Sequence, residues 1–421
     1  MSGSTVRERG YTGERLYLVA LVFWGLSLLI TLSSSLQHAL PTAAHLKNPL
    51  MAGCAFLLFI KIVGFQRFTH KEALAALLIL FTGTMCSLAS RDAMPIVIAA
   101  FVASSEGVRL KSVVKVVFSY VVFAIVVSSI STLFFGGGGL YRYDIQGLKS
   151  LALGFNSKNT LGGYLLSIVA CITYVLEGKR RKTATVLTAV ILVLDYGFVN
   201  SRTSALIVLL ILAYQLAIKK DAVPMRGLGF SKAWFIAVFL AVVVVSVGVC
   251  VCYTSQDPLL VATDDLFSNR LSLAHYFFDD YGLTLFGQEV DFRSLSGYFI
   301  ETSFYAIDNA YCHFLITYGI IPFLLLVAAN LMVLARGESV VSRTAVVLFL
   351  CFSLYGACEC LSYYPQINPF FSIIGMVIFS DSGKQLCTVS SSGASEARSL
   401  AFRYGKGDPA NSGSYIKSRE E

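Results

Sequence analysis

Runs of apolar residues recur along most of the chain, and short polar connections separate them. Each run has about 16–22 residues, close to the length that an α-helix needs to cross a bilayer. This pattern predicts an all-α, polytopic membrane protein with about 12 transmembrane helices. We expect these helices at residues 17–35, 49–66, 72–89, 94–108, 113–134, 160–177, 184–200, 203–218, 233–253, 309–334, 342–362 and 367–380.

The composition and the placement of charge support this interpretation. Charged residues make up 14% of the chain, whereas soluble domains carry about 25%. Most of the 33 Lys and Arg residues lie at the termini and in alternate connections. Because basic residues stay on the cytoplasmic side, we expect both termini in the cytoplasm and the protein in the inner (cytoplasmic) membrane of a cell. The net charge of +8 then reflects orientation, and we expect no nucleic-acid partner.

The chain is expected to divide into a membrane domain, residues 1–380, and a cytoplasmic tail, residues 381–421. The tail is rich in Ser, Gly and charged residues, a composition typical of disorder. The longest connection, residues 254–308, lies on the outer face between the ninth and tenth predicted helices. A loop of this length without a disorder signature commonly serves a function.

One part of the long outer loop has the periodicity of a helix. Its apolar residues recur at the spacing of one helix face, at Phe267, Leu271, Ala274, Phe278 and Tyr281. We interpret this segment as a helix lying in the membrane interface. Arg270 would then lie at the boundary between the apolar stripe and the aqueous phase.

Neither the cysteines nor the histidines suggest a metal site. Most of the ten cysteines lie inside apolar runs, where a thiol behaves as a small hydrophobic group. No pair has the spacing of a zinc site, and the five histidines do not cluster. We therefore expect no metal and no cofactor.

The helices predicted at 160–177 and 184–200 form a hairpin with a basic turn, Lys179 to Lys182. If this turn is cytoplasmic, the polar residues around Asn156 and around Arg202 meet at the opposite membrane face. A guanidinium there would lie at the depth of lipid headgroups. Arg202 could equally be a simple anchor of a helix end in the headgroup region.

Three motifs around these positions resemble the superfamily of O-antigen ligases and polysaccharide repeat-unit polymerases. They are GFNSKNTLGGYL from Gly154, FVNSRTSALIVLL from Phe198, and NRLSLAHYFF from Asn269, the last followed by DNAYCHFLITYGIIPFL from Asp308. Their order and their spacing around the long outer loop carry the resemblance, which covers roughly residues 150–335. Ligases of this superfamily carry histidine where this chain has Asp308, and the aspartate form is closer to exopolysaccharide or capsule polymerases.

The resemblance implies glycosyl transfer on the outer membrane face. The donor would be an oligosaccharide linked to a polyprenyl diphosphate, and the acceptor would be a sugar hydroxyl of a second lipid-linked unit. Membrane lipid would surround the protein. A chain-length regulator and a flippase would be further partners. If the donor carries a polyprenyl chain, a lipid-facing groove is expected near Arg202 and Arg270.

The resemblance and the chemistry together suggest roles for individual residues. Arginine suits a leaving diphosphate, because it stays charged and binds phosphate oxygens in pairs. Arg202 and Arg270 are therefore expected to be catalytic. A general base must take the proton of the acceptor hydroxyl, and Asp308 is the first candidate, with His275 and Glu301 as weaker ones. Substrate-binding candidates are Asn156, Lys158, Asn159, Asn309, Tyr311 and Glu359.

Simpler roles are open for several of these residues. Arg270 could be an ordinary interfacial cation, and Asp308 could cap the helix that follows it. Asp195, near the outer end of the helix predicted at 184–200, could pair with Arg202 or orient it.

Two other functions are open at this point. A ligase would transfer a finished glycan to lipid A-core, protein or wall. A transporter, such as a lipid-linked-oligosaccharide flippase or a sugar permease, could also have twelve helices. Transporters commonly contain two repeated halves, but the sequence shows no such symmetry and few charges within the predicted helices.

Overall fold

A computed structural model of the chain describes residues 3–136, 139–143, 149–177, 180–217, 231–267, 269–292 and 307–380. The chain divides into two units, Met1–Phe379 and Ser380–Glu421. The predicted disordered tail, 381–421, and the candidate base Glu301 lie outside the described residues.

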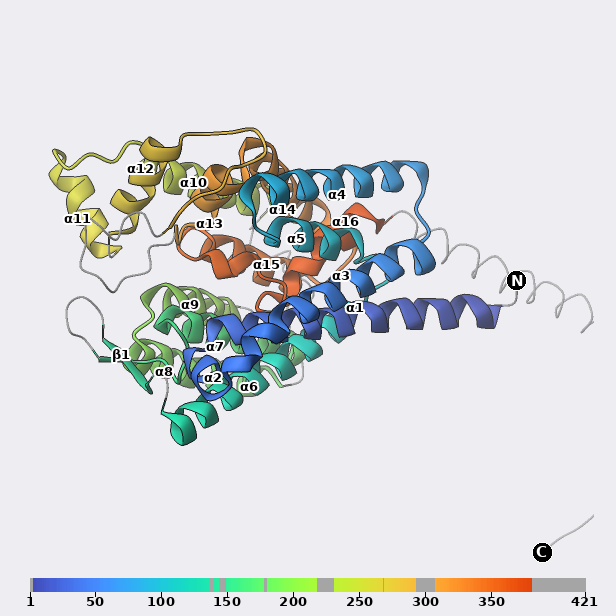
Figure 1. Cartoon of the computed structure of the whole chain (residues 1–421), viewed down its shortest axis with the longest axis horizontal. Coiled ribbons are helices and arrows are strands. Elements are labelled where there is room, and N and C mark those ends of the chain that lie inside the picture. The colour runs from blue at the N-terminus through green and yellow to red at the C-terminus, as the bar shows by residue number, and fades with distance from the viewer. Residues whose placement is uncertain are drawn as a thin grey trace, which may run out of the picture. The chain divides into compact units, whose positions relative to one another are not determined.

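The predicted all-α class is confirmed for the described part of the first unit, in which most residues are helical (Figure 1). The longer helices are α1 (Gly3–Leu32), α3 (Ala44–Phe65), α4 (His70–Ser90), α5 (Met94–Ala103), α6 (Leu110–Phe135), α7 (Lys158–Val175), α8 (Arg181–Leu194), α9 (Arg202–Ala217), α10 (Lys232–Val251), α11 (Pro258–Leu266), α12 (Arg270–Tyr281), α14 (Ile320–Arg336) and α15 (Arg343–Tyr355).

Short elements complete the described fold. They are the helices α2 (Ser34–Ala39), α13 (Ala310–His313) and α16 (Ile373–Ile378), the 3-10 turns η1 (Pro41–Ala43), η5 (Gly337–Ser339), η6 (Cys360–Tyr363) and η7 (Pro369–Ser372), the π-helical turns η2 (Asp195–Val199) and η4 (Phe314–Tyr318), and the antiparallel strands β1 (Tyr141–Tyr143) and β2 (Lys149–Leu151).

Seven helices among the described residues are long and apolar enough to cross a membrane: Tyr11–Leu32, Pro41–Phe65, His70–Ser90, Leu110–Phe135, Arg181–Val199, Lys232–Val251 and Ile320–Ser339. The other five predicted spans fall on α7 or on shorter apolar helices such as α9 and α15. The chain therefore has the helices of a membrane protein, but the number of twelve spans is not established.

The packing separates an internal core from an apolar surface. Helix α1 packs along α3, and α4 packs along α5 (Figure 1). In the core, Tyr120 donates a 2.8 Å hydrogen bond to the carbonyl of Gly25 and lies 3.2 Å from the hydroxyl of Tyr164. Large apolar side chains on several candidate spans are exposed instead, including Leu77 on α4 and Val244 on α10. Exposed apolar surface of this extent is expected where a helix faces lipid.

The prediction of a single helix at 309–334 is wrong, because the structure divides this segment into α13, η4 and α14. The division occurs at Gly319, whose φ of +95° is accessible mainly to glycine. Residues of the preceding loop insert here: Thr284 accepts a backbone hydrogen bond from Ile320, and Gln288 donates one to Thr317. The part of the long loop around residues 284–288 is thus fixed to the start of α14.

The helix predicted from the apolar stripe in the outer loop is present as α12. Leu271 and Ala274 of the stripe are buried and pack in one cluster with Cys250 of α10 and Ile316 of η4, whereas Phe267 is 38% exposed. Protein therefore covers part of the stripe, and the interfacial location of the helix stays a prediction. In the same loop, α11 carries exposed Leu259 and Leu266, which the stripe did not include.

Candidate functional site

Arg270, the first residue of α12, lies between two carboxylates. Its Nε is 3.1 Å from Oδ2 of Asp308, and its Nη2 is 2.7 Å from Oε1 of Glu359. Its Nη1 donates a 2.5 Å hydrogen bond to the carbonyl of Cys358. The side chain is only 14% exposed. The guanidinium therefore joins α12, Asp308 two residues before α13, and the segment after α15 at one point.

The start of α12 is fixed by a neighbouring helix. Asn269 has left-handed backbone geometry, with φ of +63°, and its side chain makes no capping hydrogen bond. The buried Asp264 of α11 acts instead, since its Oδ1 accepts hydrogen bonds from the backbone N–H groups of Leu271 (2.8 Å) and Ser272 (3.2 Å). A carboxylate at a helix N-terminus is favourable. Asp264 thus holds the turn from which Arg270 extends.

Asp308 is not the cap of the helix that follows it. Asn309 takes that role, because its Oδ1 accepts hydrogen bonds from the backbone of Tyr311 (2.9 Å) and Cys312 (3.2 Å). The Asp308 carboxylate is left to face Arg270, and 36% of its side chain remains exposed. It therefore combines a fixed ion pair with access from outside.

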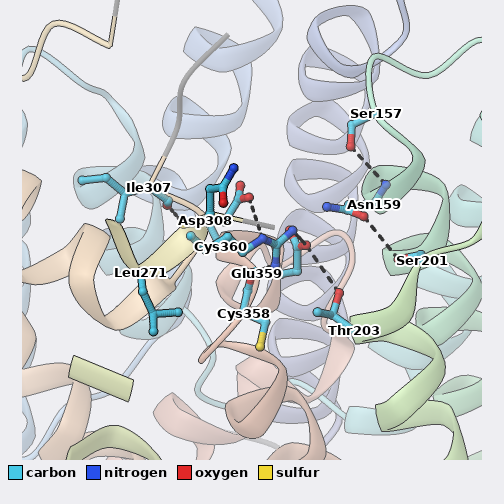
Figure 2. A network of polar contacts seen from close by, with 12 residues as sticks. Ser157, Asn159, Ser201, Thr203, Leu271, Ile307, Asp308, Cys358, Glu359 and Cys360 are labelled. Atoms are coloured by element: carbon cyan, nitrogen blue, oxygen red, sulfur yellow. Dashed lines mark hydrogen bonds and ion pairs between the residues drawn. The ribbon is translucent and has the colours of Figure 1, made fainter. Parts of the chain in front are cut away.

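Glu359 connects the cluster around Arg270 with the start of α9. Its side chain is 5% exposed and pairs with Arg270, while its Oε1 also accepts a 3.4 Å hydrogen bond from Oγ1 of Thr203. Figure 2 shows Asp308, Glu359 and Thr203 converging, with Asn159 of α7 and Ser201, the residue before α9, close by. The segments around Arg202 and Arg270, which the sequence placed at the same membrane face, therefore meet.

Residues 200–203 form the Arg202 turn: Asn200 and Ser201 separate η2 from α9, which begins at Arg202. Asn200 has left-handed geometry, with φ of +56°, and directly follows the π-helical turn. Ser201 Oγ donates a 3.5 Å hydrogen bond to Oδ1 of Asn159 on α7. Arg202 itself is exposed, and no ion pair joins it to another described residue. The sequence alternative of an Asp195–Arg202 pair is wrong, because the Asp195 carboxylate accepts a 2.6 Å hydrogen bond from Ser204.

The remaining predicted residues lie in different surroundings. Asn156 donates a 2.7 Å hydrogen bond to the carbonyl of Thr31 at the end of α1, and Lys158 begins α7 beside Asn159. Tyr311 is fully buried, and its hydroxyl donates to the carbonyl of Ser353 (2.6 Å). A direct substrate contact by Tyr311 is therefore not supported, and it serves the packing of α13 on α15.

The weaker base candidate His275 lies on another part of α12. Its Nε2 is 3.3 Å from Asp279, and the two residues border a hollow of about 330 Å³ with Ser272. Neither residue shares a contact with the cluster around Arg270 in the described structure. Among the described residues, no group of three His, Cys, Asp or Glu side chains is arranged to hold a metal ion.

An apolar groove of about 380 Å³ adjoins Arg270. Helix α10 contributes Ala241, Val245 and Val249 to its lining, and Phe267, the residue after α11, also lines it. Val245 is also 59% exposed, so the groove opens onto the apolar surface of α10. Arg270 is part of the lining, whereas Arg202 is not. The groove expected near both arginines thus lies beside one of them.

Burial and charge act against each other on the ionisable groups. Burial raises the pKa of Glu359 to about 7, although Arg270 opposes the rise. Burial also raises the pKa of Asp308, again against the effect of Arg270. For Arg270, burial would lower the pKa, but Glu359 and Asp308 outweigh it and the pKa is raised. Arg270 is therefore charged at any physiological pH, while Glu359 can change its protonation near neutrality.

Sequence reasoning missed several residues that shape the site. Thr203 and Asp264 carry no recognisable pattern. Thr203 contacts Glu359, which is distant in the chain, and Asp264 bonds to the backbone at the start of the next helix. The two π-helical turns, η2 and η4, directly flank the Arg202 turn and α13. Turns of this kind occur frequently at functional sites, but no residue pattern marks them in advance.

No protein-family model matches the chain, and neither a curated protein nor a solved structure matches it.

Proposed function

We propose that the protein is a membrane glycosyltransferase that polymerises oligosaccharide repeat units linked to polyprenyl diphosphate. The observation that carries the proposal is the ion-paired cluster of Arg270, Asp308 and Glu359 beside the α10 groove, with the Arg202 turn bonded to the same Glu359. An apolar groove next to charged groups suits a ligand with a long apolar chain and a charged head. The orientation proposed from the basic connections places the cluster on the outer face, in a bundle of about 12 spans with both termini in the cytoplasm.

Asp308 is proposed as the general base. Its carboxylate is partly exposed and is held at one oxygen by Arg270, so the other oxygen can approach an acceptor hydroxyl. The proton of the hydroxyl passes to this carboxylate, and the hydroxyl oxygen forms a bond to the anomeric carbon of the donor. The bond between that carbon and the diphosphate breaks, and its electron pair leaves with the phosphate oxygen.

Arg202 is proposed as the cation that meets the leaving diphosphate. It is exposed, and it lies at the first position of α9, where the helix N-terminus also favours an anion. Asn159, hydrogen-bonded to the same turn, is placed to contact the sugar or the phosphate. Preorganised positive charge of this kind lowers a barrier by about 2.7–4 kcal/mol in other enzymes.

The proposal is tested by a gel of lipid-linked glycans from cells that lack the protein. The cells are complemented with the wild type, Arg202→Ala, Asp308→Asn or, as a control, Arg91→Ala. Arg91 is an exposed arginine at the end of α4 that pairs with Glu289 and does not contact the site. We expect single repeats to accumulate, and only the wild type and Arg91→Ala to restore the long polymer. Long polymer that stays on its carrier would favour a ligase, and an unchanged ladder would favour a transporter.

A further inference from the structure

The charge around Arg270 is already compensated. A guanidinium has three nitrogen atoms that carry N–H donors, and each of those of Arg270 has an acceptor: Asp308, Glu359 or the carbonyl of Cys358. With both carboxylates ionised the cluster carries one net negative charge, and with Glu359 protonated it is neutral. In neither state does the cluster present net positive charge to a diphosphate.

Arg202 differs from Arg270 in each of these respects. Its side chain is exposed, and among the described residues it has no carboxylate partner. The contacts that hold the turn are made by the residues on either side of Arg202: Ser201 contacts Asn159, and Thr203 contacts Glu359. The turn is thus fixed while the guanidinium of Arg202 is left accessible.

We propose that the two arginines have separate tasks: Arg270 is a positioning residue that holds Asp308 as the base, and Arg202 meets the diphosphate. The division rests on the proposed glycosyl transfer. It departs from the expectation that both arginines bind phosphate. The planar fork of Arg270 contacts Asp308 through Nε and Glu359 through Nη2, so it fixes the two carboxylates relative to each other.

The first test is equilibrium binding of undecaprenyl diphosphate to the purified full-length protein in detergent micelles. We expect Arg202→Ala to weaken binding about 10- to 100-fold, the loss typical of a hydrogen bond to a charged group. Arg270→Ala, at a residue that also lines the α10 groove, is expected to weaken binding far less than Arg202→Ala does, and the control Arg91→Ala is expected to bind as the wild type does. Arg202→Lys should recover part of the affinity because an ammonium still attracts phosphate. Arg270→Lys should not recover catalysis because one ammonium cannot contact three acceptors in a plane.

The second test is the pH dependence of kcat/KM, measured with lipid-linked repeats from cells that lack the protein. Arg270 lowers the pKa of Asp308 relative to burial alone, so Arg270→Ala should move the acidic limb to higher pH. It should also reduce kcat about 100-fold, the effect of a misplaced reacting group. Arg202→Ala should raise KM and also lower kcat, because it removes the cation that meets the leaving diphosphate, but it should leave the acidic limb in place. Within the described part of the chain, the other ionisable groups that face Asp308 are Glu359, Cys358 and Cys360.

The outcomes separate the two proposals. A wild type that binds undecaprenyl diphosphate but forms no polymer would reject the glycosyl transfer, whereas the binding assay would still test the division of tasks. If Arg270→Ala weakens binding as much as Arg202→Ala and leaves the acidic limb unmoved, the division is wrong. Should Arg270→Ala fail to fold, Arg270→Gln supplies the same comparison, since its planar amide can still donate to one carboxylate.

Discussion

The Asp195 carboxylate accepts a 2.6 Å hydrogen bond from Oγ of Ser204, nine residues further along the chain. Asp195 is fully buried, and its carbonyl also accepts hydrogen bonds from the backbone of Asn200 and Ser201. The residue therefore fixes both ends of the turn that carries Arg202. It acts on Arg202 through this turn and not through an ion pair.

We predict that Asp195→Ala displaces the Arg202 turn, because it leaves the hydroxyl of Ser204 without its carboxylate partner. The loss of a buried partner costs about 1–3 kcal/mol of the free energy of unfolding. Thermal unfolding in detergent would measure this loss, and the KM for the lipid-linked donor should rise. Asp195→Asn keeps an acceptor oxygen and should be milder, and Tyr196→Ala, at an exposed neighbour, is the control. Equal effects of Asp195→Asn and Asp195→Ala would contradict the role of the hydrogen bond.

A second prediction concerns Glu359 and pH. Burial raises its pKa from 4.5 to about 7 in the folded protein, so the folded state binds more protons than the unfolded state between these values. The free energy of unfolding should therefore fall as pH rises through this window, by at most about 1.4 kcal/mol per pH unit. Glu359→Gln removes the titration and should flatten the slope, which midpoints of thermal unfolding from pH 4.5 to 8 would show. Glu289→Gln, in the exposed pair with Arg91, should leave the slope as in the wild type.

The sequence predicts the helices well because long apolar runs leave few alternatives to a helix in a membrane protein. It also predicts that Arg202 and Arg270 lie at the same end of the helix bundle, because successive connections alternate between the two ends. It does not predict that Arg270 faces two carboxylates, because Asp308 and Glu359 are distant in the chain and each contact depends on the packing of α12, α13 and α15.

Two local features escape the sequence for the same kind of reason. The period of the apolar stripe on α12 cannot distinguish lipid from a protein surface, and Leu271 and Ala274 of the stripe pack against other helices of the protein. Asp308 and Asn309 are both suitable N-caps by residue type, and only the backbone geometry selects Asn309. Patterns therefore identify elements, while the partners of each face and each cap depend on the tertiary structure.

A third prediction uses the close contact between α7 and the Arg202 turn. A Cβ added to Gly162 would collide with the hydroxyl groups of Ser201 and Ser204. Gly162→Ala should push the turn away from α7, at a cost of about 1–3 kcal/mol, and reduce polymer formation in the complementation gel. The adjacent Gly163→Ala is a matched control, since its Cβ would meet Leu361 at 3.3 Å and the hydroxyl of Tyr355 at 3.4 Å. Similar losses from both substitutions would indicate general damage to α7.

The last prediction tests the groove as the site of the polyprenyl chain. Ala241 lines the groove on α10, and Ala241→Trp would fill much of its volume with an indole ring. We expect undecaprenyl diphosphate to bind at least about tenfold more weakly, because loss of a few buried methylene contacts, at about 0.8 kcal/mol each, amounts to that factor. Soluble pyrophosphate, which has no chain, should inhibit the variant as it does the wild type. Val244→Trp, at a 67% exposed position of the same helix that does not line the groove, should bind normally. Normal binding by Ala241→Trp would place the chain elsewhere on the protein.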